Sequence, residues 1–484
     1  MPRELLVLGL GTSGAAAARR ALADGDEVTV FAGEPTAASR DVARVLGEAG
    51  ARVVFGCEDV TGSFDVCVAS PGIPQVSSFY QSALRSSAEL ISEPEYAWRS
   101  SPAAWIAVTG TNGKSTTAAL ISHILCASGV EWGLCGNTQD ETATDVASAI
   151  GVGGIVVCEL SSFQLASTRR FAPEVGVLTN IGEDHLAWHG GRDAYARAKK
   201  RLFANMKEGS TAVVCAGVDG WEDLERDLRG RGARFVVVGE RRKADCAFCD
   251  GDASDARSTL VLVDSYGSAR NLCTVGELRI AGPHNVANAL AAAAAALALS
   301  ASDGGAGGCA SAAGGSLSPA SVAGALRSFT ALSHRIERCG DVGSVEFFDD
   351  SKATNPDAAA VAVRSFAGRP VVLLAGGRDK GGPLDDLVAA AAGCCRAVVC
   401  FGEGGARFER AMRDGGVPAV SADGLRDAFA AACDLSRPGD VVVLSPACAS
   451  FDEFTSYAER GDVFKALVAD AAAAEGSVRC GDGD

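Results

Sequence analysis

A glycine-rich segment just after residue 100 combines the residue types that bind phosphate groups. The apolar run Ile106–Val108 leads into seven residues of different character: Gly110, Thr111, Asn112, Gly113, Lys114, Ser115 and Thr116. Backbone N–H groups at a helix N-terminus favour an anion, a lysine adds a full positive charge, and a Ser or Thr hydroxyl can bind Mg²⁺. Val108 replaces the first glycine of the general phosphate-loop pattern, so the loop is a variant. A plain glycine turn is the alternative, and the strand–loop–lysine–helix context disfavours it.

Two further residues follow apolar runs that are predicted to be parallel strands. Glu159 comes directly after Ile155–Cys158, and His185 follows Val175–Leu178. The carboxyl ends of parallel strands form the edge at which such sheets bind ligands. A carboxylate at this edge is a suitable ligand for Mg²⁺, which prefers hard oxygen donors. Each residue taken alone could equally cap a helix or lie at the surface.

A second glycine pattern, Gly9–Gly14 (GLGTSG), follows the first apolar run of the chain. In dinucleotide-binding proteins this pattern is accompanied by an acidic residue at the end of the second strand. Here that strand is predicted at Val28–Phe31 and is followed by Ala32 and Gly33. The missing acid argues against a dehydrogenase.

Composition restricts the class of protein. The chain has 484 residues, of which 48% are hydrophobic and 21% charged, so we expect a globular protein of about three domains. The net charge of −16 disfavours nucleic-acid and anionic-membrane partners. Leu5–Leu8 is too short for a secretory signal and Ala289–Leu299 too short for a membrane span. The seventeen cysteines are therefore expected to be reduced thiols in the cytoplasm.

The phosphate loop, spelled GTNGKST, resembles that of the Mur ligase family and its folylpolyglutamate-synthase relatives. Six more motifs resemble the family and keep its order: Glu159–Leu165 (ELSSFQL), Asn180–His185 (NIGEDH), Gly282–Asn288 (GPHNVAN), Ser333–Arg335 (SHR), Asp350–Asn355 (DSKATN) and Ser445–Asp452 (SPACASFD). They span nearly the whole chain. Within the family, ELSSFQL, DSKATN and SPACASFD resemble the D-glutamate-adding branch, and the DNPR-like motif of the diaminopimelate- or lysine-adding branches is absent.

The resemblance implies a monomeric, cytoplasmic, ATP- and Mg²⁺-dependent ligase. Such an enzyme joins D-glutamate to UDP-N-acetylmuramoyl-L-alanine through an acyl phosphate, in the synthesis of peptidoglycan precursors. It also implies that ATP contacts the phosphate loop and the residues Asn285, Asn288, Arg335 and Asp350. In phosphoryl transfer the protein mainly positions groups and stabilises charge, a role suited to Lys114 and Arg335. Asn285 and Asn288 could alternatively be helix caps.

The resemblance also implies substrate and metal contacts. Those for the UDP substrate are Thr12, Ser13, Gly72, Asn137, Gln164 and His185. Ala32 stands where family members often carry an acidic uridine contact. Those for D-glutamate are Lys352, Thr354, Lys380, Ser450 and Tyr457, a set of lysines and hydroxyls that suits two carboxylates. Those for metal are Ser115, Glu159, His185 and a carbamylated Lys199.

Lys199 is the least obvious of these residues. Taken alone, the segment Arg197–Arg201 predicts a solvated basic helix face. The family pattern is a tyrosine followed four places later by a carbamylated lysine, and Tyr195 and Lys199 match it. Burial near a metal would lower the pKa of the lysine and favour the neutral amine that reacts with CO₂. Lys114, His185, Lys199 and Arg335 are thus the expected catalytic residues.

Short apolar runs alternate with amphipathic stretches, a pattern typical of βαβ units and parallel sheets. Besides the runs named above, strands are predicted at Val53–Phe55, Val66–Ala69, Ala212–Cys215, Val345–Phe348, Val371–Leu374, Ala397–Phe401 and Val441–Leu444. We therefore expect an α/β protein of three domains. These are a Rossmann-like N-terminal domain (1–98), a central P-loop ATPase-like parallel-sheet domain (99–330) and a C-terminal Rossmann-like domain (331–484).

Three connecting segments are predicted as well. The proline-containing segment Glu93–Pro102 is expected to be a linker, and the Gly/Ala/Ser-rich segment Ser300–Ser318 a flexible surface loop. A hinge is expected near Phe329–Ser333, because the C-terminal domain must close over the central one to assemble the site.

Two other functions stay open on sequence alone. A sister ligase of the same mechanism would add another amino acid. A catalytically inactive nucleotide-binding protein would keep the fold as a sensor, although the presence of Lys114, Glu159, His185, Lys199 and Arg335 together argues against it.

Overall fold

The computed structural model describes residues 2–137, 141–280, 282–300, 317–330, 332–366 and 368–481. Most of the predicted flexible loop Ser300–Ser318 lies outside these residues, as does Ala331 within the predicted hinge. The strands of the described residues form three separate sheets. We name the parts around them the N-terminal unit (β1 to α4), the central unit (β6 to α13) and the C-terminal unit (β15 to α18).

The N-terminal unit is a parallel sheet with helices between its strands. In chain order its elements are β1 (Glu4–Leu8), α1 (Thr12–Ala23), β2 (Glu27–Ala32), α2 (Ala37–Glu48), β3 (Arg52–Phe55), β4 (Phe64–Ala69), α3 (Ser78–Ser86), β5 (Ser87–Ser92) and α4 (Glu93–Ser100). The strand order is β3-β2-β1-β4-β5, with every pairing parallel. The order reverses at β1, which places the GLGTSG turn at the switch point where such sheets bind ligands.

The central unit begins with β6 (Ala104–Thr109), α5 (Lys114–Ala127), β7 (Trp132–Gly136), α6 (Ala143–Ala149), β8 (Ile155–Glu159), α7 (Ser162–Ala166), β9 (Val175–Leu178), α8 (Leu186–His189) and α9 (Arg192–Lys200). It continues with β10 (Thr211–Cys215), α10 (Trp221–Gly230), β11 (Arg234–Val238), β12 (Cys246–Asp250), β13 (Thr259–Val263), β14 (Ala269–Thr274), α11 (Pro283–Ser300) and α13 (Pro319–Ser328). The sheet order is β14-β13-β12-β11-β10-β9-β6-β8-β7, and β12, β13 and β14 pair antiparallel at one edge.

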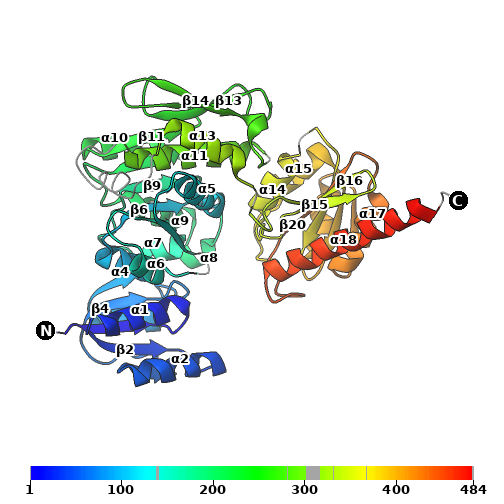
Figure 1. The fold of residues 1–484 in the computed structure, drawn as a ribbon. Coiled ribbons are helices and arrows are strands. Elements are labelled where there is room, and N and C mark those ends of the chain that lie inside the picture. The colour runs from blue at the N-terminus through cyan, green and yellow to red at the C-terminus, as the bar shows by residue number, and fades with distance from the viewer. Residues whose placement is uncertain are drawn as a thin grey trace.

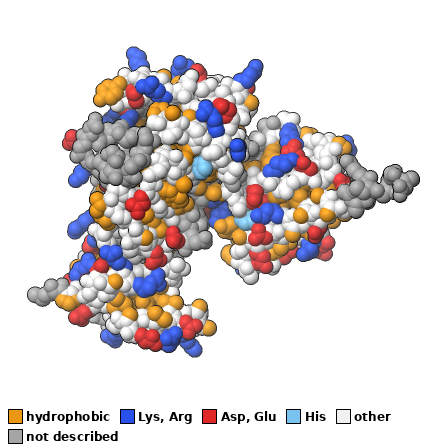
Figure 2. All heavy atoms as spheres, in the orientation of Figure 1, with side chains coloured by type: hydrophobic (Ala, Val, Ile, Leu, Met, Phe, Trp, Pro, Cys, Tyr) orange, Lys and Arg blue, Asp and Glu red, His pale blue; other side chains and the backbone are white. Residues whose placement is uncertain are grey.

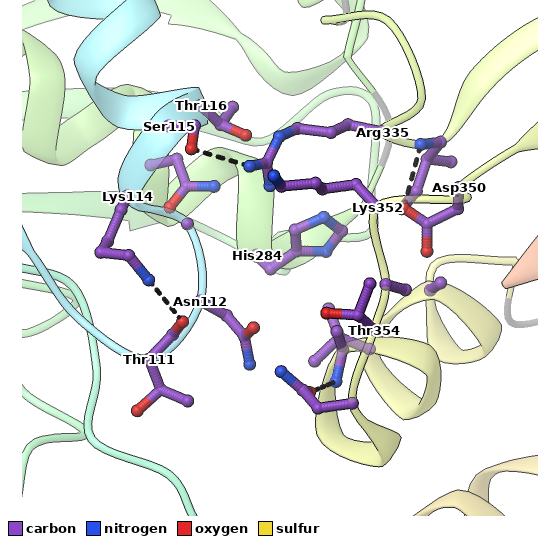
Figure 3. Close-up of a pocket in the computed structure, with 18 of the residues that line it drawn as sticks. Thr111, Asn112, Lys114, Ser115, Thr116, His284, Arg335, Asp350, Lys352 and Thr354 are labelled. Atoms are coloured by element: carbon purple, nitrogen blue, oxygen red, sulfur yellow. Dashed lines mark hydrogen bonds between the residues drawn. The ribbon is translucent and has the colours of Figure 1, made fainter. Parts of the chain in front are cut away.

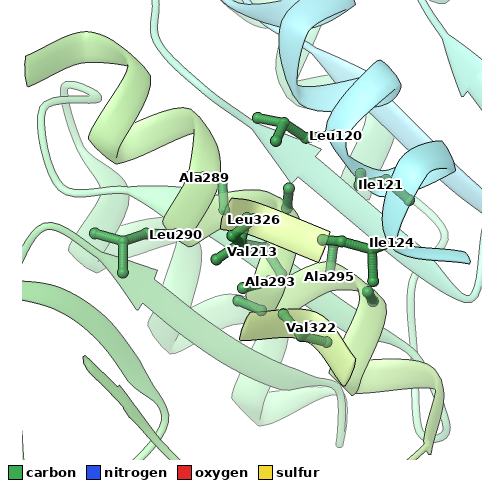
Figure 4. Packing of buried hydrophobic residues seen from close by; sticks show 14 of the residues in the cluster. Leu120, Ile121, Ile124, Val213, Ala289, Leu290, Ala293, Ala295, Val322 and Leu326 are labelled. Atoms are coloured by element: carbon green, nitrogen blue, oxygen red, sulfur yellow. The ribbon is translucent and has the colours of Figure 1, made fainter. Parts of the chain in front are cut away.

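Packing of the alanine-rich helix α11 closes one face of the central sheet. Figure 4 shows Leu120, Ile121 and Ile124 of α5 beside the small side chains of α11, with Val322 and Leu326 of α13 completing the layer. Alanines let the helices and the sheet approach closely, so α11 is buried almost all round. This packing fixes the N-terminal ends of both α5 and α11 relative to the sheet.

The C-terminal unit is a second α/β layer structure. It comprises β15 (Glu337–Val342), β16 (Val345–Asp349), α14 (Pro356–Arg364), β17 (Val371–Gly376), α15 (Asp385–Cys394), β18 (Cys395–Phe401), α16 (Gly405–Asp414), β19 (Ala419–Ala422), α17 (Leu425–Leu435), β20 (Val441–Ala447) and α18 (Tyr457–Gly481). The sheet order is β15-β16-β20-β17-β18-β19, parallel except for the β15–β16 hairpin.

The predicted α/β class and the parallel sheets are confirmed, and each predicted strand lies within an observed one. The predicted linker Glu93–Pro102 is wrong over most of its length. Residues Glu93–Ser100 form α4, with Pro94 in its first turn, and Glu93 and Glu95 are buried. Proline suits the first turn of a helix because the N–H it lacks would be unpaired there.

The N-terminal and central units form a column, and the C-terminal unit lies to one side of it (Figure 1). Acidic and basic side chains are mixed over the visible face, which is hollowed between the C-terminal unit and the column (Figure 2). In the part of the chain that the structure describes, no helix is both long and apolar enough to cross a membrane.

Candidate active site

A cavity of about 300 Å³ lies between the central and C-terminal units. It brings together many of the residues predicted for ATP, metal, D-glutamate and the UDP substrate, although they are far apart in sequence. From the central unit these are Thr111, Asn112, Gly113, Lys114, Ser115, Thr116, Asn137, Glu159, His185, Asn285 and Asn288; from the C-terminal side they are Arg335, Asp350, Lys352, Thr354 and Lys380.

The phosphate loop joins β6 to α5 as the sequence predicts. Gly110 and Gly113 have positive φ angles, and a Cβ there would meet Thr179 Oγ1 at 1.9 Å and Asn288 Oδ1 at 2.5 Å. Only glycine fits both positions. The Nζ of Lys114 donates to the carbonyls of Gly110 (2.9 Å) and Thr111 (2.8 Å), and burial lowers its pKa.

A chain of hydrogen bonds links Glu159 and Ser115 of the central unit to Arg335 of the C-terminal side. The hydroxyl of Ser115 donates to Glu159 Oε2 at 2.5 Å, and Arg335 Nη2 donates to the same Ser115 oxygen at 2.7 Å. Glu159 is completely buried at the carboxyl end of β8. Figure 3 shows Arg335 reaching across from the C-terminal side toward Ser115.

His185 lies on the loop that follows β9. It adopts a left-handed conformation (φ 53°), which is uncommon for a residue other than glycine and indicates local strain. The centre of its ring lies 4.7 Å from the centre of the Phe163 ring, and its Nε2 lies 3.4 Å from Asp184 Oδ2. Burial lowers the pKa of His185, which favours the neutral imidazole that can bind a metal.

Lys199 lies next to the phosphate loop. Its side chain is buried, unlike that of Arg197, and its Nζ donates to the carbonyl of Gly110 at 2.6 Å. The Nζ also lies 4.6 Å from the ring centre of Tyr195, whose hydroxyl is 2.9 Å from Thr111 Oγ1. The solvated basic face that the segment alone would predict is therefore wrong for Lys199. Burial, followed by the charge of Lys114, lowers the pKa of Lys199.

The GPHNVAN motif forms the start of α11. Asn285 and Asn288 lie inside this helix, so the helix-cap alternative is excluded. The Nδ2 of Asn288 donates to Asn285 Oδ1 at 3.0 Å, and Asn288 Oδ1 accepts a hydrogen bond from Thr117 at 3.3 Å. Both amides are buried against the phosphate loop.

Charged residues from the C-terminal side complete the cavity. Asp350 accepts hydrogen bonds from Ser445 Oγ (2.7 Å) and Ile336 N (3.3 Å), and burial raises the pKa of Asp350 to about 7. Burial lowers the pKa of Lys352 to about 8. The Nζ of Lys352 lies 3.8 Å from the ring centre of Tyr457.

Comparisons with known proteins agree with this arrangement. Residues 108–296 match the family described as Mur ligase middle domain, and residues 334–448 match that described as Mur ligase, glutamate ligase domain. The chain is 35% identical to the UDP-N-acetylmuramoylalanine–D-glutamate ligase of Geobacillus kaustophilus over 466 residues, 96% of each chain. It is 38% identical to the ligase of the same name from Frankia casuarinae over 472 residues, 96% of this chain and 93% of that one. This chain belongs to the Mur ligase family.

A solved Mur ligase shows the same fold. The UDP-N-acetylmuramoylalanyl-D-glutamyl-2,6-diaminopimelate–D-alanyl-D-alanyl ligase from Acinetobacter baumannii superposes with a TM-score of 0.57 at 18% identity, covering 92% of this chain and 90% of that one.

Some residues predicted from the Mur ligase motifs do not line the cavity: Gly110, Thr12, Ser13, Gly72, Gln164, Lys199, Ser450 and Tyr457. Gly110 and Lys199 lie next to the cavity, and the hydrogen bond from Lys199 Nζ to the Gly110 carbonyl joins them. Gln164 forms a capping box with Ser161, whose N–H donates to Gln164 Oε1 at 2.8 Å, so this oxygen already has a partner.

Three of the six predicted UDP-substrate contacts, Thr12, Ser13 and Gly72, are on the N-terminal unit of the Mur ligase, outside the cavity. Thr12 and Ser13 begin α1, and Gly72 lies in the turn after β4, the strand next to β1. The turn is joined to the glycine loop by a hydrogen bond from Ser70 Oγ to the carbonyl of Gly9 (3.4 Å). All three residues are thus at the carboxyl edge of one sheet.

Among the cavity residues that were not predicted individually, Asp184 and His284 carry titratable side chains. Asp184 accepts a hydrogen bond from the backbone N–H of His185 (2.9 Å), and His284 lies 3.3 Å from Ser365 Oγ of the C-terminal unit. Burial lowers the pKa of His284 to about 4, so its ring is neutral at physiological pH. Both residues stand inside the motifs NIGEDH and GPHNVAN, which is the signal that could have singled them out.

The backbone that presents Arg335 is held by a buried hydrogen bond between the side chains of His334 and Asp349. The Nδ1 of His334 lies 2.7 Å from Asp349 Oδ2, and both side chains are buried. A Cβ on Gly461 would lie 2.2 Å from that ring nitrogen, so only glycine at this position leaves space for the His334 and Asp349 side chains. Among the described residues His334, Glu337 and Asp349 are close enough to hold a metal, but Lys465 Nζ already lies 3.3 Å from Glu337 Oε2.

Proposed function

We propose that this Mur ligase joins D-glutamate to UDP-N-acetylmuramoyl-L-alanine and converts ATP to ADP and phosphate. The observation that carries the proposal is the cavity itself. Its lining includes the phosphate loop from the central unit and Lys352 of the D-glutamate-type DSKATN segment from the C-terminal unit. The curated relatives named as D-glutamate ligases support this choice of amino acid.

The charges in the cavity suit this reaction. The substrate carboxylate attacks the γ-phosphorus of ATP, ADP leaves, and the amine of D-glutamate then attacks the acyl phosphate and displaces phosphate. Every partner is an anion, so repulsion must be offset by cations aimed at the reacting groups. Lys114 and Arg335 reach the cavity from opposite sides, and Lys352 and Lys380 line its D-glutamate end. The chain supplies these cations despite its net charge of −16.

The donor set fits Mg²⁺, which ATP-dependent phosphoryl transfer requires to neutralise charge on the phosphates. Ser115 and Glu159 offer a hydroxyl and a carboxylate within hydrogen-bond distance of each other, and both are hard oxygen donors. We propose that they hold one ion and that His185 contributes to a second. Arg335, which now donates to Ser115, would then turn toward the phosphates.

We also propose that Lys199 carries a carbamate. Its amine is buried beside the phosphate loop, with its pKa lowered by that burial, and a neutral amine is the form that reacts with CO₂. Carbamylation would place an anion beside Lys114, where opposite charges attract.

The UDP group is proposed to bind the N-terminal unit, at the turn containing Thr12, Ser13 and Gly72. The muramoyl-alanine end would then extend toward Asn137, whose Nδ2 donates to Glu159 Oε1 at 3.2 Å. A cytoplasmic location and a monomeric state complete the proposal; sedimentation at micromolar concentration tests the second.

A substrate panel tests the function directly. The protein is incubated with ATP, Mg²⁺, UDP-N-acetylmuramoyl-L-alanine and, separately, D-glutamate, L-glutamate, L-lysine, diaminopimelate or L-alanine, and products are identified by mass. We expect product with D-glutamate and ADP release that depends on it. Product with another amino acid alone would make this a sister ligase, and ATP binding without any product would indicate an inactive nucleotide-binding protein.

A further inference from the structure

A carboxylate of the C-terminal unit contacts the loop that carries His185. Asp357 stands in the first turn of α14, and its Oδ2 accepts a hydrogen bond from the backbone N–H of Glu183 at 3.3 Å. The two residues are 174 positions apart in the chain. Asp357 belongs to none of the ATP, metal, UDP or D-glutamate contacts described above.

The loop is shaped to receive this carboxylate. A Cβ on Gly182 would lie 2.9 Å from Asp357 Oδ2, closer than side chains approach in folded proteins. The next neighbour of that Cβ would be Thr111 Cγ2 at an ordinary 3.6 Å, and Gly182 does not have a left-handed φ. The absence of a side chain at Gly182 therefore provides the space that Asp357 occupies.

The same loop is anchored to the phosphate loop on its other side. The N–H of Gly182 donates to Thr111 Oγ1 at 2.9 Å, and Asn180 Oδ1 accepts from the N–H groups of Thr111 (3.1 Å) and Asn112 (2.9 Å). Asp357 thus reaches a loop that is already rigidly attached to the nucleotide side of the cavity.

On its own side, Asp357 is fixed to the proposed D-glutamate contacts. Lys352 and Thr354 precede it in the same segment, and Asn355 caps α14 by accepting the N–H of Ala358 at 2.8 Å. A contact made by Asp357 therefore sets the distance between this segment and His185. Glu183 and Asp184 repel the Asp357 carboxylate, so the N–H of Glu183 is the attractive partner that holds it.

We propose that Asp357 is a positioning residue, which docks the D-glutamate segment onto the Gly182–Glu183 backbone when the C-terminal unit closes. The inference rests on the proposed function, because it assigns Asp357 a part in assembling that site. A structural alternative is that Asp357 only stabilises α14, since an acid in the first turn of a helix interacts favourably with the helix dipole.

A double-mutant cycle between Asp357→Ala and Gly182→Ala distinguishes the two roles. In Gly182→Ala the new methyl group displaces the carboxylate while Asp357 itself is kept. We expect each single variant to lower kcat with D-glutamate about tenfold, the loss of one hydrogen bond to a charged group. The double variant should be no worse than either single one, because both remove the same contact.

Three controls complete the design. Asp357→Asn keeps an acceptor oxygen and should retain activity within about threefold of wild type. Asp427→Ala removes an exposed acid from the first turn of α17, far from the cavity, and should leave kcat unchanged while reporting any helix-dipole effect on melting temperature. Affinity for UDP-N-acetylmuramoyl-L-alanine, measured by calorimetry, should be the same in all variants.

Additive losses in the double variant, or a kcat for Asp357→Ala within twofold of wild type, would overturn the inference while the proposed function stands. Equal losses in Asp357→Asn and Asp357→Ala, with equal falls in melting temperature, would assign Asp357 to helix stability. If the wild-type protein forms no D-glutamate product, the proposed function fails and the inference falls with it.

Discussion

The two boundaries of the central unit differ in how they are made. At the boundary with the N-terminal unit, exposed side-chain contacts such as Arg19 with Asp145 accompany hydrogen bonds between buried carboxylates and backbone groups. Glu93 Oε1 accepts from the N–H and hydroxyl of Thr144 (2.6 and 2.5 Å), Ser92 N donates to the carbonyl of Ser167 (3.0 Å), and Glu95 accepts from Arg170 N (2.8 Å).

At the boundary with the C-terminal unit, contacts involve the ends of side chains around a cavity. They include Arg335 with Ser115, Ser365 with His284, and the partly exposed carboxylate of Asp357 with the backbone N–H of Glu183. The ends of side chains exchange partners easily, whereas buried carboxylates paired with backbone groups cannot separate without an uncompensated cost. The difference indicates that the N-terminal and central units behave as one body, onto which the C-terminal unit docks.

The largest loss of activity is expected for a residue of the cavity between the central and C-terminal units. Lys114→Ala should lower product formation about a thousandfold, because a cation aimed at the transferring phosphoryl group is lost. Binding of UDP-N-acetylmuramoyl-L-alanine by calorimetry should stay intact, since its UDP group is proposed to bind the N-terminal unit. Turnover within tenfold of wild type would remove Lys114 from the reaction and weaken the contrast between the boundaries.

The next largest loss of activity is expected on replacing Lys199, the buried lysine beside the phosphate loop. Lys199→Ala should lower activity about a hundredfold, and added formate or acetate should restore part of it by replacing the carbamate. The matched control is Lys200→Ala, whose Nζ only donates to the carbonyl of Asp219 at 2.8 Å and which should be mild. A greater loss in Lys200→Ala, or no rescue of Lys199→Ala, would contradict the carbamate.

The smallest effect is a stability change at the N-terminal boundary. Burial raises the pKa of Glu93 to about 7, above its value in the unfolded chain. The protonated carboxyl group therefore contributes stability that is fully present below the unfolded pKa. This contribution is lost as the pH rises through about 7. Glu93→Gln keeps the acceptor for Thr144 without the charge. Urea unfolding should show the variant close to wild type at pH 5 and about 2 kcal/mol more stable than wild type at pH 8.5. If the free energies of unfolding of Glu93→Gln and wild type differ by the same amount at both pH values, Glu93 does not titrate in this range.

Every strand that was predicted carries a short apolar run. β5, β7 and β14 were not predicted, because strands such as Ala269–Thr274 carry no apolar run longer than two residues. β11 (Arg234–Val238) and β13 (Thr259–Val263) were missed although each carries a buried apolar run. The segment Glu93–Ser100 was taken for a linker because its charges and prolines are typical of one. Its carboxylates are buried only because Thr144, Arg169 and Arg170 of the central unit supply N–H partners, which sequence alone cannot show.

The candidate site shows the same limit. Motifs predicted the phosphate loop, Glu159, His185 and Arg335, because each carries a residue type with distinctive chemistry. Asp357 could not be found in this way, since its partner is a backbone N–H in a distant segment. The domain limits 1–98, 99–330 and 331–484 stay predictions, and α4 extends across residue 98.

Docking of the C-terminal unit is the central claim, and small-angle X-ray scattering tests it most directly. The radius of gyration is measured for the free protein and for the protein with a non-hydrolysable ATP analogue, Mg²⁺ and UDP-N-acetylmuramoyl-L-alanine. The account predicts a smaller radius with the ligands, and a weaker change in Gly182→Ala, whose docking contact is displaced. An unchanged wild-type radius would contradict closure as the step that assembles the site.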